Sequence, residues 1–539
     1  MNPRPRLTSK LTRVRNAVLG FVLRPFRWFS PTAQFLIGFV TMVVATSGLL
    51  VRWPLTVNAI GILLLVLGSY FVLWRFVDSR DIVSLSISKR RAFALVGCAV
   101  VFETAVMRFG LLVATGMAAQ STRLPLNDPS VWALTIPFAA ASLLVTMLLN
   151  RQLGLVTGVI TAIFAGLLAT HGTHATLYAL ISCSAAVYGI KRYRERQSIT
   201  LAGLVVAGVN GITALALIAF AQPRLTLSGA IIAAGCAIGG GLLTIVFAAG
   251  GVPINESLFG ILTDIRLLEL SNADLPVLSQ LALRAPGTNQ HSVAVGQLAE
   301  DACRAIGANA LLARIGALYH DIGKVAAPEH FVENQSGQNP HDRLRPLQSA
   351  KIITSHVTYG LKLANEIGLP QRVTDFIPQH HGTRTLHFFL QKARAEAEDG
   401  KEIDESEFRY PGPRPKFKES AILMLADSAE AAARSLAHPD PESVQAIVAR
   451  IFEAIISDGQ LDESTLTLRE LKQIRDALIA SLNALYHARI DYPGFNVPAP
   501  KESGNADHTQ EPRGVTYQNA SDVPINPSGE VEDEAISRE

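Results

Sequence analysis

Apolar and polar positions divide this chain into two unlike parts. Up to about residue 251, long apolar segments alternate with short polar ones, whereas from residue 264 onward charged residues are mixed with apolar ones at helical spacing. Most of the apolar segments approach the ~20 residues that a membrane-spanning helix needs, although 153–170 and 175–190 are short. The first part is therefore predicted to be a transmembrane helix bundle over 33–251 with about eight spans. The segments are about 33–51, 57–77, 92–114, 130–149, 153–170, 175–190, 199–221 and 226–250.

The charged residues between these segments predict how the bundle is oriented. Loops assigned to one side are rich in Lys and Arg and those assigned to the other are poor in them, which matches the positive-inside rule. With an even number of spans, both termini are then expected in the cytoplasm. The inside loops hold Arg75, Arg80, Lys89, Arg90, Arg91, Arg151, Lys191, Arg192, Arg194 and Arg196, and the outside loops hold Arg52, Arg123 and Arg224.

Residues 1–32 are basic and contain no acidic residue. Such an arm is expected in the cytoplasm, where it would contact anionic lipid headgroups. A cleaved signal peptide is the alternative, but the basic region is long and no A-x-A site closes the apolar stretch that follows. The lipid bilayer is therefore the expected partner of this part of the chain.

Two charged residues interrupt the third apolar segment. Glu103 and Arg108 lie ~140° apart on a helix, so they are not expected to pair on one face. Glu103, which is nearer the centre, is expected to face the bundle interior, as a packing contact rather than as part of a transport path. The glycine-rich run 235–251 is expected to let helices pack closely.

The second part of the chain is predicted to be helical. Residues 252–276 form an amphipathic linker helix whose apolar stripe fits another helix or the partner of a homodimer. Residues 277–497 contain many segments of helical period and no convincing strand pattern, so the fold class is all-α. Residues 498–539 are acidic, rich in Pro, Asn and Ser and poor in large apolar residues, which predicts a disordered tail. The linker stripe is Leu258, Ile261, Leu262, Ile265 and Leu268.

The segment 311–324 is central to the prediction of a functional site. Its apolar residues recur at helical spacing, and His320-Asp321 stands off that apolar stripe. Gly323 follows as a helix stop. A His-Asp pair also occurs by chance in many chains, so the pair alone decides little.

Other histidines and carboxylates add to this pair. Imidazole and carboxylate suit Fe, Mn, Co or Zn, and the cysteines form no CxxC pair that would favour a structural zinc. Five imidazoles and two carboxylates exceed the usual complement of one metal, and they divide between two ions if Asp321 bridges. A net charge of +3 without a basic stripe speaks against a nucleic acid polymer as a partner. The candidate ligands are His291, His320, Asp321, His356, His380, His381 and Asp427.

The order H…HD…H…HH…D resembles the HD-domain metal phosphohydrolases in their binuclear form. The flanking residues resemble more closely the membrane-bound seven-transmembrane HD-domain proteins of bacteria, the PgpH-type cyclic-di-AMP phosphodiesterases. This likeness runs through the soluble domain and the linker. It rests on Ala285-Pro286-Gly287-Thr288, Tyr319-His320-Asp321-Ile322-Gly323-Lys324, Glu333-Asn334-Gln335, Asn339-Pro340-His341-Asp342, His380-His381-Gly382-Thr383, Phe408-Arg409-Tyr410-Pro411-Gly412-Pro413 and Asp458-Gly459-Gln460-Leu461.

The resemblance implies a chemistry and an assignment of ligands. One divalent ion, Mn or Fe, would be held by His291, His320, Asp321 and Asp427, and a second by Asp321, His356, His380 and His381. The substrate would be the cyclic dinucleotide cyclic di-AMP, opened to linear pApA at the cytoplasmic face of the bacterial inner membrane. Lys324 could neutralise a phosphate oxygen, or it could be an ordinary lysine at a helix end.

Two other functions remain open from the sequence. One is a phosphohydrolase that acts on cyclic di-GMP or an alarmone, although Gly382-Thr383 differs from the HD-GYP proteins that open cyclic di-GMP. The other is a membrane receptor with an inactive HD fold, which the complete ligand set disfavours. Members of the family usually carry a large extracytoplasmic domain after the first span, whereas only residues 52–56 separate the first two apolar segments here. The external sensor is therefore expected to be missing.

Overall fold

The structure is a computed structural model that describes residues 30–51, 57–79, 87–190, 197–221, 226–335, 337–397, 403–436 and 439–486. Most of the predicted basic arm, the whole predicted acidic tail and several of the basic loops lie outside these ranges. Within them the chain is helical and contains no strand, only an isolated bridge between Thr385 and Arg409. The prediction of an all-α fold is confirmed.

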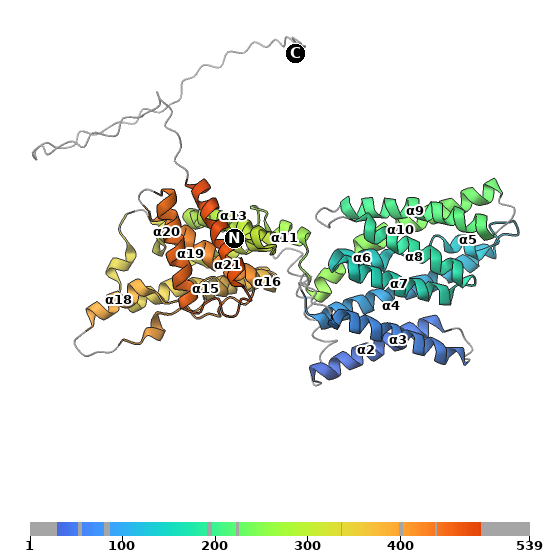
Figure 1. Cartoon of the computed structure of the whole chain (residues 1–539), viewed down its shortest axis with the longest axis horizontal. Coiled ribbons are helices and arrows are strands. Elements are labelled where there is room, and N and C mark those ends of the chain that lie inside the picture. The colour runs from blue at the N-terminus through green and yellow to red at the C-terminus, as the bar shows by residue number, and fades with distance from the viewer. Residues whose placement is uncertain are drawn as a thin grey trace, which may run out of the picture. The chain divides into compact units, whose positions relative to one another are not determined.

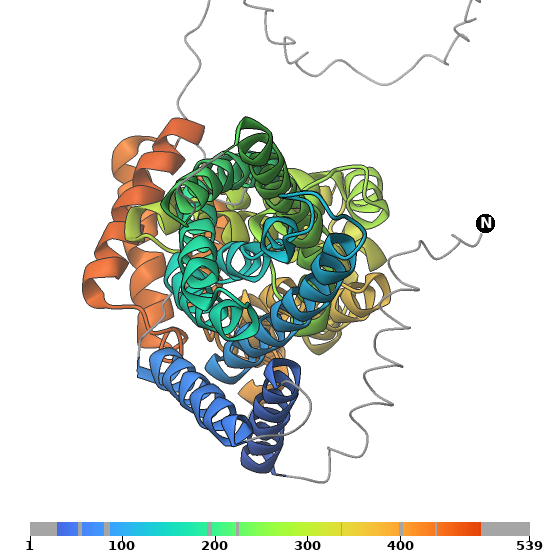
Figure 2. The same cartoon turned by 90° about the vertical axis from the view of Figure 1, so that its right-hand side faces the viewer.

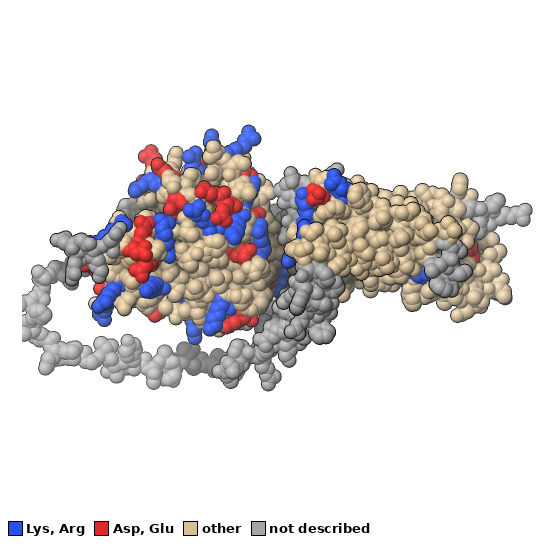
Figure 3. Space-filling model, turned by 90° about the horizontal axis from the view of Figure 1, so that it is seen from below, with Lys and Arg blue, Asp and Glu red and all other residues tan. Residues whose placement is uncertain are grey.

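The first part of the chain is a bundle of long helices that run side by side (Figures 1 and 2). Six of them (α2, α3, α4, α7, α9 and α10) are long and apolar enough to cross a membrane by length and composition. The face seen in Figure 3 is a broad expanse of uncharged side chains, as a surface in contact with lipid requires. The helices are α2 (Pro31–Leu50), α3 (Asn58–Ser79), α4 (Lys89–Ala118), α5 (Pro129–Ala133), α6 (Ala140–Leu148), α7 (Arg151–Leu168), α8 (Gly172–Gly189), α9 (Gln197–Ala221) and α10 (Leu227–Phe259).

The apolar segment 130–149 is not one helix, in contrast to the other predicted spans. It is divided into α5 and α6, because Pro137 lacks an N–H donor and disfavours helical geometry at Ile136. The two short helices nevertheless follow α10 along its length. A Cβ added at Gly240 would lie 2.6 Å from the carbonyl oxygen of Leu134, and one at Gly251 would lie 3.3 Å from the side chain of Leu144.

The glycine-rich run 235–251 allows close helix packing, as predicted. A Cβ added at Gly241 would overlap the backbone of Ala207 in α9. The run does not end the helix, since α10 continues to Phe259. The predicted linker helix 252–276 is therefore wrong as a single element.

The linker is divided by local backbone signals. Gly260 ends α10 in the left-handed conformation (φ 67°), and the side chain of Thr263 accepts from the backbone N–H of Arg266 to begin a new helix. This new helix, α11 (Asp264–Leu270), buries Leu267 and Leu270 in the core of the second helical domain.

That domain is built around α19, which packs against α13, α14, α17, α20 and α21. Its core is apolar and includes Leu281, Val295, Ile315, Phe376 and Met424, all fully buried. The α-helices are α11, α12 (Pro276–Arg284), α13 (Pro286–Ile306), α14 (Ala310–Tyr319), α15 (Pro346–Ile367), α16 (Gln371–Thr374), α17 (Phe376–Gln379), α18 (His387–Glu396), α19 (Lys418–Arg434), α20 (Pro441–Ser457) and α21 (Leu468–Leu485). Five 3-10 turns join them: η2 (Ile322–Ala326), η3 (Pro328–His330), η4 (Val332–Asn334), η5 (Pro340–Arg343) and η6 (Glu405–Phe408).

Candidate metal centre

The fold brings all seven candidate ligands together from distant parts of the sequence. Their ligand atoms form two groups, and within each group every ligand atom lies within 4.8 Å of the others. One group is His291 from α13, His320 from the end of α14 and Asp427 from α19. The other is Asp321, which follows His320, with His356 from α15 and His380 and His381 from the turn after α17.

The turn that carries His320 and Asp321 depends on Gly323. Helix α14 ends at Tyr319, so Gly323 is not the helix stop that the sequence predicted. Its role is close packing, because a Cβ added at Gly323 would overlap the carbonyl oxygen of His356 and lie 2.7 Å from the backbone N of Gly360. The absence of a side chain thus lets η2 lie directly against α15, which places Asp321 beside His356.

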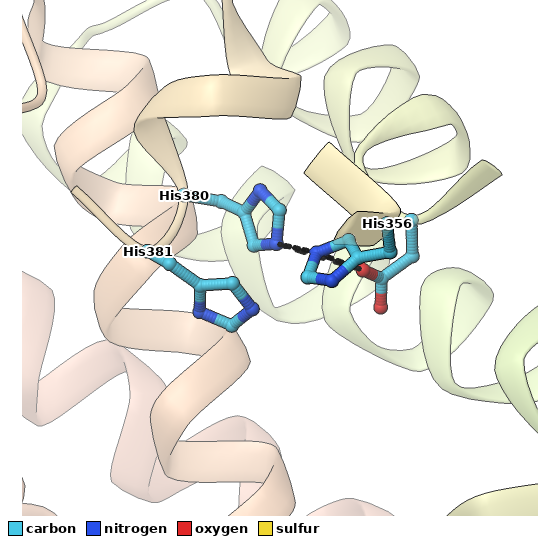
Figure 4. A group of neighbouring side chains, drawn as sticks. His356, His380 and His381 are labelled. Carbon is cyan, nitrogen blue, oxygen red and sulfur yellow. Dashed lines mark hydrogen bonds and ion pairs between the residues drawn. The ribbon is translucent and has the colours of Figure 1, made fainter. Parts of the chain in front are cut away.

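Three imidazoles are oriented by backbone carbonyl groups. Nδ1 of His320 lies 2.6 Å from the carbonyl oxygen of Ala317, and the corresponding distances are 2.6 Å for His356 and Ile353 and 2.8 Å for His380 and Ile377. In the neutral form of each ring, the proton on Nδ1 is donated to a carbonyl oxygen, which leaves Nε2 with a free lone pair. Figure 4 shows the rings of His356 and His380 turned toward each other, with the dashed line marking the 3.4 Å between their Nε2 atoms.

Asp321 lies between the two groups and contacts both. Its Oδ2 is 3.1 Å from Nε2 of His320, and its Oδ1 is 3.4 Å from Nε2 of His356 and 3.5 Å from Nε2 of His380. Nε2 of His320 and Oδ1 of Asp321 are buried and have no hydrogen-bond partner among the described residues. Lone pairs that face each other without a proton or cation between them repel, and burying them unpaired is costly. The cluster therefore fits a bound cation.

The third carboxylate of the site was missed by the sequence analysis. Nε2 of His291 lies 2.8 Å from Oδ1 of Asp427, and its Nδ1 lies 2.6 Å from Oε2 of Glu430. The other oxygen of Glu430 accepts from Tyr486 at 3.3 Å and pairs with Arg434. Asp427 and Glu430 stand three residues apart on one face of α19, and this spacing is the signal that could have identified Glu430.

Lys324 contacts two carboxylates. Its Nζ lies 2.8 Å from Oδ2 of Asp321 and 2.8 Å from Oε1 of Glu333 in η4. Burial by itself would lower the pKa of Lys324, but these two carboxylates outweigh it and raise that pKa, so the ammonium stays charged. Glu333 also accepts from the hydroxyl of Thr288 at 2.9 Å. The sequence placed Lys324 near the cluster but gave Glu333 no role.

Protons are distributed unevenly over the imidazoles. Burial lowers the pKa of His356 to about 3 and also lowers the pKa of His381, so both rings are neutral. Burial opposes the charge on His320 too, but the carboxylates of Asp321 and Asp427 raise its pKa to about 10. The pKa of Asp321 falls well below its usual range, because the adjacent charges of His320 and Lys324 outweigh its burial. Neutral imidazole and ionised carboxylate are the forms that bind a metal, so a metal held by His320 would take the place of the proton on that ring.

Both parts of the chain are similar to known proteins. Residues 56–263 match the family described as a 7TM receptor with intracellular HD hydrolase, and residues 288–432 match the HD domain. The cyclic-di-AMP phosphodiesterase PgpH of Bacillus subtilis is 41% identical over 367 residues, which is 66% of this chain and 51% of that protein. The chain belongs to the seven-transmembrane HD-domain family.

A second curated relative and a solved structure are also similar to this seven-transmembrane HD-domain protein. PgpH of Listeria monocytogenes is 40% identical over 366 residues, covering 67% of this chain and 50% of that protein. The crystal structure of the HD domain of the Listeria monocytogenes protein is 45% identical, covers 40% of this chain and 100% of that one, and superposes with a TM-score of 0.38. The chain spans about half the length of the curated relatives it matches. All seven candidate ligands and Glu430 lie within the matched HD domain.

Proposed function

We propose that this protein is a membrane-bound, metal-dependent phosphodiesterase that opens cyclic di-AMP to linear pApA. The observation that carries the proposal is the Asp321 carboxylate, which is shared between two groups of imidazoles and leaves buried nitrogen and oxygen atoms without partners. The activity in the names of the PgpH relatives supports the reaction class and the substrate. We also infer that the bundle lies in the bacterial inner membrane with both termini and the HD domain in the cytoplasm, where the nucleotide is found.

The residues of the cluster would hold two divalent transition-metal ions, Mn or Fe. His291, His320, Asp321 and Asp427 would hold one, and Asp321, His356, His380 and His381 would hold the other. Two such ions, when bound, supply a nucleophilic hydroxide at neutral pH and stabilise the attacking and leaving oxygens of an in-line displacement at phosphorus.

The chain's own residues position this chemistry. Lys324 holds Oδ2 of Asp321 with one N–H and Glu333 with a second, which leaves a third donor for a phosphate oxygen of the substrate. The ring of Tyr410 stacks on the ring of His381, with centroids 4.2 Å apart, and so fixes that imidazole. Glu430 fixes His291 from the opposite side of the ring. Each ligand is thus held in its orientation before a metal or substrate arrives.

The choice between adenine and guanine dinucleotides is tested directly. Full-length protein in lipid nanodiscs, supplied with Mn²⁺, is incubated separately with cyclic di-AMP and cyclic di-GMP, and the products are separated by chromatography. We expect cyclic di-AMP to give pApA and to turn over at least tenfold faster than cyclic di-GMP, since one lost or mismatched base contact costs about 1.4 kcal/mol or more. Faster turnover of cyclic di-GMP would contradict the proposed substrate, and no turnover of either would support the inactive receptor.

Metal binding should stabilise the HD domain against heat. A ligand at a concentration about 100 times its Kd stabilises the native state by about 2.7 kcal/mol, which corresponds to a rise in Tm of roughly 5–10 °C for a domain of this size. Differential scanning fluorimetry of the full-length protein with and without Mn²⁺ measures this rise, and Mg²⁺ at the same concentration is the control. An unchanged Tm with Mn²⁺ would mean that the buried atoms of the cluster do not bind the ion.

Glu430 should tune the metal site without being a ligand. Replacing it by glutamine removes the charge that accepts from Nδ1 of His291, which makes Nε2 a weaker donor, so we expect a 10- to 100-fold loss of metal affinity at one site. The measurement is a Mn²⁺ titration of Glu430→Gln and of wild type. Glu453→Gln on the exposed face of α20 is the matched control and should bind as wild type does. Equal affinity in Glu430→Gln and wild type would exclude this role.

A further inference from the structure

The break between α5 and α6 lies inside the membrane bundle, where backbone groups cannot be satisfied by bulk water. Three of its backbone groups are bound by side chains of neighbouring helices. Tyr178 donates to the carbonyl oxygen of Leu134 at 3.1 Å, and Cys183 donates to the carbonyl oxygen of Phe138 at 3.2 Å. The third is the N–H of Ala141 in the first turn of α6, which donates to Oε2 of Glu103 at 3.1 Å. Of these three side chains, only the carboxyl group of Glu103 is of a type that is ordinarily ionised at neutral pH.

Glu103 is fully buried midway along the 30-residue helix α4, and it faces the bundle interior as the sequence predicted. Its Oε2 accepts from the N–H of Ala141, whereas its Oε1 is buried and has no hydrogen-bond partner among the residues that the structure describes. Within the described part of the chain it forms no ion pair. Charged groups also occur elsewhere on α4 and on the helices packed against it. They are Lys89, Arg90, Arg91 and Arg108 on α4, Arg75 and Asp78 on α3, Arg151 on α7 and Glu256 on α10. The other titratable groups nearby are Tyr70, Cys98, Cys183 and Cys236.

A carboxylate at this depth needs a positive charge to compensate it. Hard metal cations take six or more oxygen ligands, and one oxygen of Glu103 is already occupied by an N–H donor, whose positive end repels a cation. A proton needs only one oxygen, and Oε1 is the one left without a partner. Burial favours the neutral carboxyl, while the N-terminus of α6 favours the ionised one. Because these two effects oppose each other, the carboxyl group of Glu103 can be either protonated or ionised.

A cavity lies beside the break between α5 and α6. A cavity of about 540 Å³ at α5 is lined by Asp128, His171 and His174 and reaches Leu134 and Phe138 at the break itself. Its polar side chains and its size are sufficient for water. Phe138, which lines the cavity, lies three residues before Ala141, the residue whose N–H donates to Glu103.

We propose that Glu103 is a proton-binding site of the membrane bundle, filled from this cavity. A hydronium ion in the cavity gives up a proton and becomes water, and the proton binds Oε1 of Glu103. The reverse step restores the carboxylate, which holds the N–H of Ala141 more strongly. The break is in direct contact with α10, because a Cβ added at Gly240 would lie 2.6 Å from the carbonyl oxygen of Leu134 and 3.1 Å from that of Ile136. Binding or release of the proton therefore changes the packing of the helix that leads to the HD domain. The site does not depend on the proposed phosphodiesterase activity.

Infrared difference spectroscopy of the full-length protein in nanodiscs tests the proposal. We expect the carbonyl band of one protonated, buried carboxyl per chain at neutral pH, which disappears as the pH is raised. Glu103→Gln should lose this band, while its amide oxygen still accepts from Ala141. Asp128→Asn is the matched control and should retain the band, because Asp128 caps α5 and accepts from the backbone N–H of Ser130 at 2.8 Å, away from Glu103 in the sequence.

Three results would overturn the proposal. One is the absence of any carboxyl band that Glu103→Gln removes across mildly acidic to alkaline pH. A second is a band whose titration shifts with Na⁺ concentration at constant osmolarity, which would make the site a metal-cation site. The third concerns Glu103→Asp, a variant that retains a carboxyl group and can be used if Glu103→Gln fails to fold. If its carboxyl band has the same position and the same titration midpoint as in wild type, another carboxyl group is responsible for the band. Amide exchange over 134–141 should change with the titration in wild type and not in Glu103→Gln.

Discussion

Replacing Asp321 by asparagine should lower the hydrolysis of cyclic di-AMP by roughly 10³-fold or more, since loss of several kcal/mol of transition-state stabilisation by the metals corresponds to about that factor. Asp321 contacts imidazoles of both groups through different oxygens. An amide keeps the shape of the side chain but has no charge and only one acceptor oxygen. It therefore cannot bridge two cations, and both sites should weaken together. Steady-state assays with Mn²⁺ measure the loss.

The control for this variant is Asp476→Asn on α21. Asp476 is exposed, its closest charged partner is Arg475 at 3.6 Å, and it does not contact the cluster. We expect it to hydrolyse the substrate at the wild-type rate. An Asp321→Asn protein that folds and keeps more than a tenth of wild-type turnover would show that Asp321 is not shared between two metals.

The second large effect is expected from a residue with no side chain. Gly323→Ala would place a methyl group against the backbone of α15, at the carbonyl oxygen of His356, and a backbone atom cannot rotate away. Overpacking of this kind costs about 3 kcal/mol or more, which lowers the Tm of the HD domain by roughly 6–12 °C. Relief of the overlap must move η2 away from α15, and with it Asp321 away from His356. Metal affinity and turnover should therefore fall along with stability.

The matched control is Gly296→Ala in α13 of the same domain. An added Cβ there would meet its nearest neighbours at 3.4–3.6 Å, which is ordinary contact. Alanine is also a better helix former than glycine, so this variant should be as stable as wild type or slightly more stable. Scanning fluorimetry measures the Tm of both variants. An unchanged Tm for Gly323→Ala would mean that η2 does not lie directly against α15.

The sequence predicted the helical class and the candidate ligands because both are recorded in residue type and spacing. The doublets His320-Asp321 and His380-His381 can be identified without knowing the fold, and apolar length identifies the long helices. What the sequence could not provide was the partner of each ligand. Glu430 and Glu333 look like ordinary helix and loop residues until α19 and η4 are placed beside α13 and η2.

Backbone geometry accounts for the predictions that were wrong. Pro137 and Gly260 are both visible in the sequence as breaking signals, yet the apolar pattern around them continues without interruption. The hydrophobic periodicity therefore predicted continuous helices where the structure has α5 and α6, and α10 and α11. The break at Pro137 is tolerated because Glu103, Tyr178 and Cys183 satisfy the backbone, and these residues are distant in sequence.

The two-metal centre is tested most directly by counting bound ions at equilibrium. Full-length protein in nanodiscs is titrated with Mn²⁺, and the electron paramagnetic resonance signal of the free ion gives the number bound. We expect two equivalents per chain in wild type, and one in a His356→Ala/His380→Ala protein, because that variant keeps only Asp321 and His381 of the second group and leaves the group of His291, His320 and Asp427 intact. Binding of a single equivalent by wild type, or of none, would contradict a centre in which Asp321 is shared between two ions.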